Sequence, residues 1–149
     1  MMSVTELKNL YELDESQWLE ETVKLLKNKQ FQALDLENLI EELEDLGREK
    51  KNAVASLLEQ VIRHLLLLQY WTSESEYNAV HWQEEIYNFR IQLKRRLTTN
   101  LRNYLESELN SLYQDALGFV KIKTKNSVSF PLECPYSLDQ LLDIEWLPD

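Results

Sequence analysis

The sequence has little of the residues that end or reverse secondary structure. Glycine occurs twice and proline three times among its 149 residues. So few turn-forming residues argue against a fold of many short strands, because each pair of neighbouring strands needs a turn. Long helices joined by few connections are therefore favoured.

Cysteine and long apolar runs are also scarce. Cys134 is the only cysteine, which excludes an intrachain disulfide and a zinc site built from cysteines. No apolar run reaches the roughly 18 residues that a membrane-spanning helix needs. The start of the sequence, Met1 to Glu6, lacks the basic and then apolar pattern of a signal peptide. We therefore expect a cytoplasmic protein outside the membrane, in which Cys134 is a packing residue.

Positive charge is in the minority. The chain has 16 Lys and Arg against 26 Asp and Glu, and its net charge is −10 at pH 7. This acidity repels phosphate backbones and argues against nucleic-acid binding. It fits either simple solubility or recognition of a basic protein partner. Two basic clusters, Lys94–Arg96 with Arg102 and the group Lys121, Lys123 and Lys125, carry no nucleic-acid motif, and we interpret them as a charged rim.

The most regular pattern extends from Asp35 to Trp71. Its apolar residues recur every three or four positions, which is typical of one helical face. They are Leu36, Leu39, Ile40, Leu43, Leu46, Ala53, Val54, Leu57, Leu58, Val61, Ile62, Leu65 and Leu68. The pattern stays in phase across Gly47, because Leu43 and Val54 are eleven residues apart, close to three helical turns. We predict one continuous helix about 55 Å long. A turn at Gly47 followed by a second helix is the alternative.

The choice at Gly47 bears on function. In a continuous helix Glu42 and His64 are roughly 33 Å apart, so they cannot share a metal ion or a proton within one chain. A hairpin at Gly47 could bring them together.

Weaker signals define the rest of the chain. Residues 1–13 are a lead-in, and Asp14 is a typical N-cap for a helix over about 14–28. A polar loop is expected over Thr72–Glu76, before an amphipathic helix that begins near Asn78.

The last third of the chain changes character. Thr98–Asn100 should interrupt the helices, and the following helix should end near Gly118. Residues 120–125 alternate apolar residues with lysine, which is typical of a strand or extended edge. Ser137 should cap a short helical turn.

These signals together predict an all-α fold, an antiparallel bundle of three to four long helices with a short irregular C-terminal tail. We expect a single helical domain over residues 1–149, with the bundle at 14–120 and the tail at 121–149.

Four segments resemble the signatures of one known family. They are the acidic stretch Asp35–Arg48 that ends in Leu-Gly-Arg; Arg63–Leu66; Trp82 with Ile86 and Arg90; and Phe130–Tyr136 followed by a tryptophan near the end. The family is domain-of-unknown-function family twenty-nine, found mostly in cyanobacteria, and the resemblance extends from Tyr11 to Pro148. It implies a small, cytoplasmic, mainly helical bacterial protein and no particular activity. The family usually has lysine after His-Leu-Leu, where this chain has Leu67.

His64 and a group of glutamates are the candidates for chemistry. His64 could be a metal ligand or a general base, or a boundary histidine bonded to a neighbouring helix. Glu41 and Glu42, with Glu37 and Glu44, could supply carboxylate ligands, and His64 with Glu42 is the candidate metal pair. Di-metal helix bundles use Glu-x-x-His, which is absent here. A solvated acidic face is therefore favoured, and no metal or other cofactor is predicted.

Arg90 has two interpretations. Its planar guanidinium could form a bidentate ion pair with Glu41 or Glu42, which would be structural. It could instead belong to an anion-binding site beside Trp82.

Two functional hypotheses follow. The first is a non-enzymatic protein-interaction module, which binds a basic protein partner through an acidic face or forms a homodimer. The alternative is an enzyme or metal-binding bundle with a site near His64, Glu41 or Glu42, and Arg90. The sequence has no Gly-rich phosphate loop and no recognisable catalytic motif, so we lean toward the first.

Overall fold

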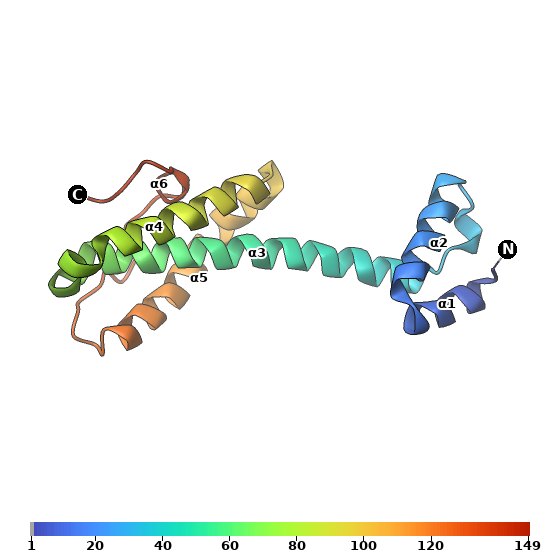
Figure 1. Cartoon of the computed structure of the whole chain (residues 1–149), viewed down its shortest axis with the longest axis horizontal. Helices are drawn as coiled ribbons and strands as arrows, with labels where there is room; N and C mark the ends of the chain where they lie inside the picture. Colours follow the sequence, from blue (N-terminus) through green and yellow to red (C-terminus); the bar gives the residue numbers. More distant parts are fainter. Residues whose placement is uncertain (1) are drawn as a thin grey trace. The chain divides into compact units, whose positions relative to one another are not determined.

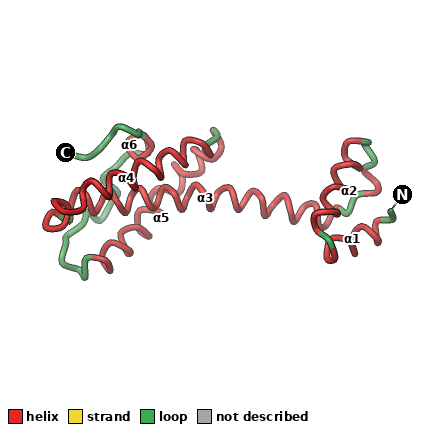
Figure 2. Tube along the Cα trace, viewed as in Figure 1, coloured by secondary structure: helices red, strands yellow, loops and turns green. Residues whose placement is uncertain are grey.

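Helices are the only regular secondary structure in residues 2–149, the part of the chain that the computed structural model describes. In chain order they are α1 (Val4–Leu13), α2 (Glu15–Lys27), the short 3₁₀ helix η1 (Phe31–Ala33), α3 (Leu36–Tyr70), α4 (Thr72–Arg96), α5 (Thr99–Lys123) and α6 (Leu138–Leu142) (Figures 1 and 2). The predicted all-α fold is confirmed.

The chain consists of two compact units, unit 1 (Met1–Glu49) and unit 2 (Lys50–Asp149). Helix α3 contributes residues to both and continues through Gly47, which confirms the continuous helix over the hinged alternative. Neither glycine in the described residues has a positive φ. One domain over 1–149 stays a prediction, because two units that share a helix can still unfold together.

Unit 1 has a small core centred on Trp18 of α2. Leu7 of α1 and Leu34 are buried with it. The Trp18 Nε1 donates a hydrogen bond to Oδ2 of the buried Asp35, at 3.2 Å. The other oxygen of this carboxylate accepts from the backbone N–H of Asn38, in the first turn of α3. Asp35 therefore accepts from a buried indole and caps α3.

The lead-in predicted over residues 1–13 is wrong, because Val4–Leu13 is helix α1. The side chain of Ser3 accepts a hydrogen bond from the Glu6 backbone and caps this helix. Helix α2 begins where it was predicted, after Asp14, whose carboxylate accepts from the Gln17 backbone.

Unit 2 contains the larger core, in which α4 and α5 pack against the second half of α3 (Figure 1). Its buried residues come from these three helices and from the segment that follows α5. They include Val54, Leu58, Val61, Ile62, Leu65, Trp82, Ile86, Leu93, Leu105, Tyr113, Ala116, Val120, Phe130, Tyr136 and Leu141. The predicted bundle is thus found in unit 2.

The polar loop predicted over Thr72–Glu76 is also wrong, because these residues form the first turn of α4. Only Trp71 separates α4 from α3. Polar residues suit the exposed first turn of a helix, so their polarity does not indicate a loop here.

Residues 120–125 are not extended, since α5 continues to Lys123. Val120 is buried and lies four residues after the buried Ala116, so the helical period persists beyond Gly118, where we expected the end. Lys121 and Lys123 fall in the last turn of α5, where cations suit the negative end of the helix dipole.

The segment after α5 packs on unit 2 through α6. Ser137 and Gln140 form the capping box of this helix, as the sequence predicts for Ser137. Leu138 and Leu141 are buried, and the Trp146 ring lies edge-on to Tyr136 at 5.7 Å. The predicted irregular tail is therefore ordered against the core.

Candidate functional site

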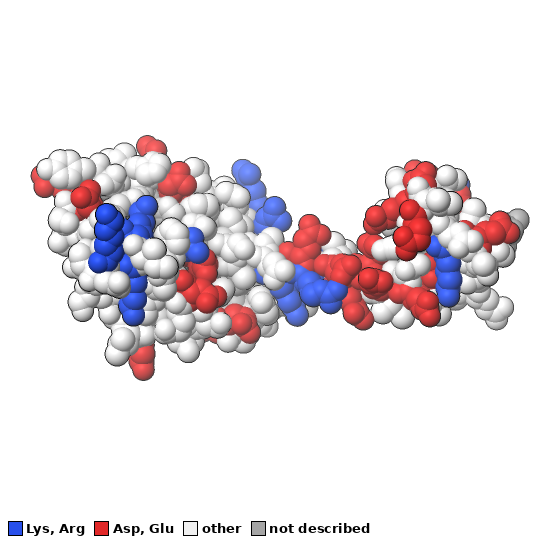
Figure 3. Space-filling view, turned by 90° about the horizontal axis from the view of Figure 1, so that it is seen from below, with Lys and Arg blue, Asp and Glu red and all other residues white. Residues whose placement is uncertain are grey.

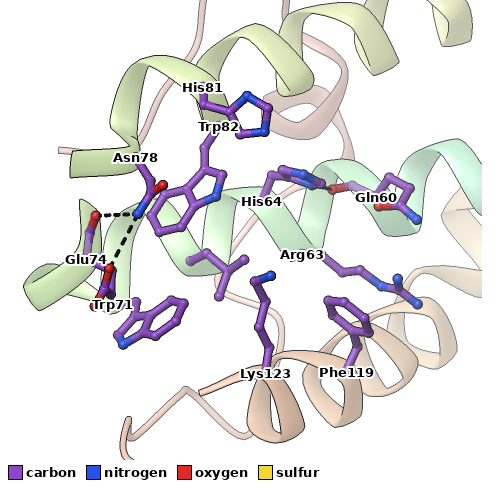
Figure 4. A pocket seen from close by; sticks show the side chains of 11 residues that line it. Gln60, Arg63, His64, Trp71, Glu74, Asn78, His81, Trp82, Phe119 and Lys123 are labelled. Carbon is purple, nitrogen blue, oxygen red and sulfur yellow. Dashed lines mark hydrogen bonds between the residues drawn. The ribbon is translucent and has the colours of Figure 1, made fainter. Parts of the chain in front are cut away.

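Unit 2 has a cavity of about 430 Å³ that is lined by α3, α4 and α5 (Figure 4). The lining residues are Gln60, Arg63, His64, Leu67, Trp71, Glu74, Asn78, His81, Trp82, Phe119 and Lys123. Their spacing follows the helical period, with steps of three and four along each helix. One face of each helix thus contributes to the same cavity.

His64 lies half-buried on the α3 side of this cavity. Its Nδ1 is 2.7 Å from the carbonyl oxygen of Gln60. Because a carbonyl only accepts, Nδ1 carries the hydrogen in the neutral ring, and Nε2 is an acceptor. Burial lowers the pKa of His64, although the Gln60 carbonyl and Glu85 oppose this. The imidazole is therefore neutral near pH 7.

Arg63 lies one residue before His64 and spans the boundary between α3 and α5. Its guanidinium lies over the Phe119 ring, 3.9 Å from the centroid, and bonds Glu59 at 2.5 Å. Its Nε is buried and has no hydrogen-bond partner in the described residues. A buried donor without an acceptor costs free energy, and the burial of this atom leaves almost no surface for a ligand to contact.

The opposite side of the cavity is aromatic. Trp71 and Trp82 stack with centroids 6.1 Å apart and an interplanar angle of 18°. Asn78 donates to the Glu74 carbonyl at 3.0 Å and lies 3.5 Å from its carboxylate. Figure 4 shows the indole nitrogen of Trp82 and the amine of Lys123 facing the interior.

Arg90 does not line this cavity. It is buried and donates three hydrogen bonds to backbone carbonyls, those of Leu141 (2.8 Å), Trp146 (2.7 Å) and Gln140 (3.0 Å). Burial lowers its pKa to about 10. The predicted pairing with Glu41 or Glu42 is wrong, and the guanidinium instead holds the C-terminal segment.

Glu41 and Glu42 belong to unit 1, whereas His64 and Arg90 belong to unit 2. The Tyr11 hydroxyl donates to the Glu42 carboxylate, and this bond raises the pKa of Tyr11. Residues 2–149 contain no group of three or more His, Cys, Asp and Glu side chains placed to hold a metal ion. Cys134 is half-buried, with its thiol 3.4 Å from the Tyr136 carbonyl, and burial raises its pKa.

The sequence pattern indicates His64 as a candidate but does not reveal most of the cavity. Arg63 was noted only as part of a family signature, although residues 60, 63, 64 and 67 share one helical face. Lys123 was assigned to a strand and therefore not placed opposite α3. The aromatic side was missed because the first turn of α4 was interpreted as a loop.

A second candidate surface lies in unit 1, on the first half of α3. Leu36, Ile40, Leu43 and Leu46 are between 47% and 60% exposed. We call these four residues the α3 stripe. The same pattern is buried farther along α3, at Val54, Leu58 and Val61 for example, so part of a core-type face has no covering element within the described residues.

Acidic residues border the α3 stripe. Glu37, Glu41 and Glu44 each follow a stripe residue directly, and all three are exposed. On the face drawn in Figure 3, acidic side chains gather over unit 1. Arg48 is the only base within Leu36–Glu49, and it pairs with Asp45.

Comparison with known families decides the chain's affiliation. The family described as "Domain of unknown function DUF29" matches residues 10–147. The chain belongs to the DUF29 family. Neither the curated proteins nor the solved structures include a match to this DUF29 protein. In residues 2–149, none of its helices combines the length and apolar character needed to cross a membrane.

Proposed function

We propose that this DUF29 protein is a non-enzymatic interaction module that binds a basic amphipathic helix of a partner protein on the α3 stripe. The observation that carries the proposal is the exposure of about half of each stripe side chain on a helix whose other half is buried. The four stripe residues are spaced three or four positions apart and therefore form a ridge along α3. A second helix can cover a ridge of this kind.

The acidic border selects the partner's charge. Glu41 and Glu44 lie beside the apolar residues and would face the flanks of a bound helix, whereas Glu37 pairs with Lys8 at 3.3 Å. Lysine or arginine on those flanks would be attracted, which speeds encounter and fixes specificity.

A second copy of the chain fits this surface less well. Two copies paired through the α3 stripe would bring together borders of the same sign, and like charges repel. The one base in this stretch, Arg48, already pairs with Asp45. Self-association is therefore the competing outcome that the experiment must test.

The probe is a fluorescent synthetic amphipathic helix of leucine and lysine, compared with a peptide in which glutamate replaces every lysine. Anisotropy titrations should show binding of the lysine peptide only. The double variant Ile40→Gln/Leu43→Gln should weaken that binding by about tenfold or more, since it removes apolar area that the complex buries. Both positions are exposed, so the fold should be kept.

Leu13→Gln is the matched control. Leu13 is 83% exposed in unit 1 but lies outside the α3 stripe, so its variant should bind like the natural chain. Equal losses in both variants, or no loss in the double variant, would contradict a specific surface. A dimer in sedimentation that Ile40→Gln/Leu43→Gln dissociates would show that a second copy is the occupant.

A further inference from the structure

The lining of the cavity of unit 2 contains two basic side chains, although the chain is acidic overall. The net charge of the protein is −10, yet the lining contains Arg63 and Lys123 and only one acidic residue, Glu74. The carboxylate of Glu74 lies beside the Asn78 amide, and the partner of Arg63, Glu59, lies outside the lining. Because Glu59 neutralises Arg63, Lys123 is the lining cation without an ion pair in the described residues, and it can attract an anion.

Donors and aromatic rings lie next to one another around the space, because Trp82 stacks on Trp71 and Lys123 follows Phe119 by one turn of α5. The Lys123 amine and the Trp82 indole nitrogen face the interior (Figure 4). Trp71 and Phe119 offer apolar ring surface, although the Arg63 guanidinium covers one face of Phe119. A ligand that fits both features has one anionic end and one planar apolar end.

We propose that this cavity binds a small aromatic carboxylate, with its oxygens on Lys123 and the Trp82 indole N–H and its ring against Trp71 and Phe119. The volume of about 430 Å³ lies within the range of small-molecule pockets, about 300–1,000 Å³. Lysine gives a charge-assisted hydrogen bond, and the rings supply the apolar contact. This binding site is independent of the α3 stripe, which lies in the other unit.

The neutral state of His64 is consistent with this assignment. Its Nε2 is an acceptor, so it does not compete with Lys123 for the carboxylate, and its uncharged ring adds to the apolar contact. Glu74 is the group that opposes the ligand, because its charge repels an anion. Removing that charge should therefore improve binding.

The experiment uses NMR to follow the indole N–H signals of the ¹⁵N-labelled full-length protein. The protein is titrated separately with three ligands of similar size and shape. Benzoate carries a negative charge, benzamide carries none and benzamidine is positive. Benzoate should shift the signals of Trp71 and Trp82 but not that of Trp18, which is buried in unit 1. Benzamide should bind about tenfold more weakly, as expected for the loss of one charge-assisted contact.

Matched variants test the anion contact. Lys123→Gln should weaken benzoate binding by about tenfold and leave benzamide binding unchanged. Lys121→Gln is the control, since Lys121 is exposed in the same last turn of α5 but does not line the cavity. Glu74→Gln should strengthen benzoate binding severalfold.

Several results would overturn the proposal. They are benzamidine binding as tight as benzoate, equal effects of Lys123→Gln and Lys121→Gln, and titrations that leave Trp71 and Trp82 unmoved. Phenyl phosphate provides the final arm. If it binds tighter than benzoate and depends on Lys123, the ligand is a phosphate ester and not a carboxylate.

Discussion

Arg90 shows how one side chain can organise a distant part of its unit. Its guanidinium donates to three carbonyls that lie 50 to 56 residues later in the chain. A planar group with five donors suits this task, and lysine cannot reproduce it. A structural role for Arg90 was one of the two interpretations of the sequence, with carboxylates as the expected acceptors. The true acceptors are backbone carbonyls, and residue identity does not show which carbonyls lie near a side chain.

Replacing Arg90 should loosen the C-terminal segment. Arg90→Met leaves three carbonyls without their donor, and we expect a loss of about 3 kcal/mol in the free energy of unfolding. Urea titration measures this loss, and limited proteolysis should show earlier cleavage around α6. Arg95→Gln, an exposed arginine of the same helix, should change stability by less than about 0.5 kcal/mol. Equal stability of the two variants would contradict the role of Arg90.

His64 should make unit 2 sensitive to mild acid. Burial lowers its pKa; the Gln60 carbonyl and Glu85 act against this, while His81 and Lys123 add to it. The folded protein therefore binds this proton less tightly than the unfolded chain does. Stability should be full above the unfolded pKa of about 6.5 and should fall as the pH drops below it.

The measurement is the free energy of unfolding in urea at about pH 7.5 and about pH 5. His64→Gln should lose less stability between these two values than the natural chain, because the titrating group is gone. His81→Gln changes an exposed histidine of the same cavity and should reduce the difference less than His64→Gln does, because His81 adds only a smaller part to the lowering of the His64 pKa. An unchanged pH dependence in His64→Gln would show that other groups cause it.

At the scale of elements, α3 was the easiest helix to predict. Its apolar period holds phase through Gly47, and no local signal outweighed it. The errors arose in short polar or alternating segments, at Thr72–Glu76 and at residues 120–125, where tertiary packing decides the structure. The cavity could not be predicted for the same reason, because the first turn of α4 and the last turn of α5 both contribute residues to its lining.

Gly47→Ala should stabilise α3. A methyl group at Gly47 would meet no atom within 4 Å, and the backbone has no positive φ there. We expect a gain of up to about 1 kcal/mol from helix propensity alone. Thermal or urea unfolding measures it, and Gly118→Ala in α5, which is equally open, should behave alike. A destabilised Gly47→Ala would mean that this position bends in solution.

At the scale of the molecule, the two units have very unequal cores. Unit 1 buries only a few large side chains, such as Leu7 and Trp18, whereas unit 2 buries apolar residues from four helices. Small cores give marginal stability. The polar run Arg48–Asn52 lies at the boundary near residue 49, but it does not reveal two units, because the helix that crosses it is uninterrupted.

Hydrogen exchange on the full chain should separate the units. Amides of α1 and α2 should exchange much faster than those of α4 and α5, because local opening costs less free energy where few apolar contacts are broken. Mass spectrometry of peptides from each helix checks this. Equal protection throughout would show that the chain unfolds as one cooperative domain, as the sequence analysis expects.

The bonds of Arg90 also have a consequence during synthesis. Its acceptors are added to the chain 50 to 56 residues after it, so the nascent polypeptide carries a cation without its carbonyls while α4 and α5 emerge from the ribosome. Unit 2 can therefore complete its folding only after residues 140–146 have emerged from the ribosome. A polypeptide truncated before residue 140 would lack all three acceptors of Arg90, and proteases could distinguish it from a chain that contains them.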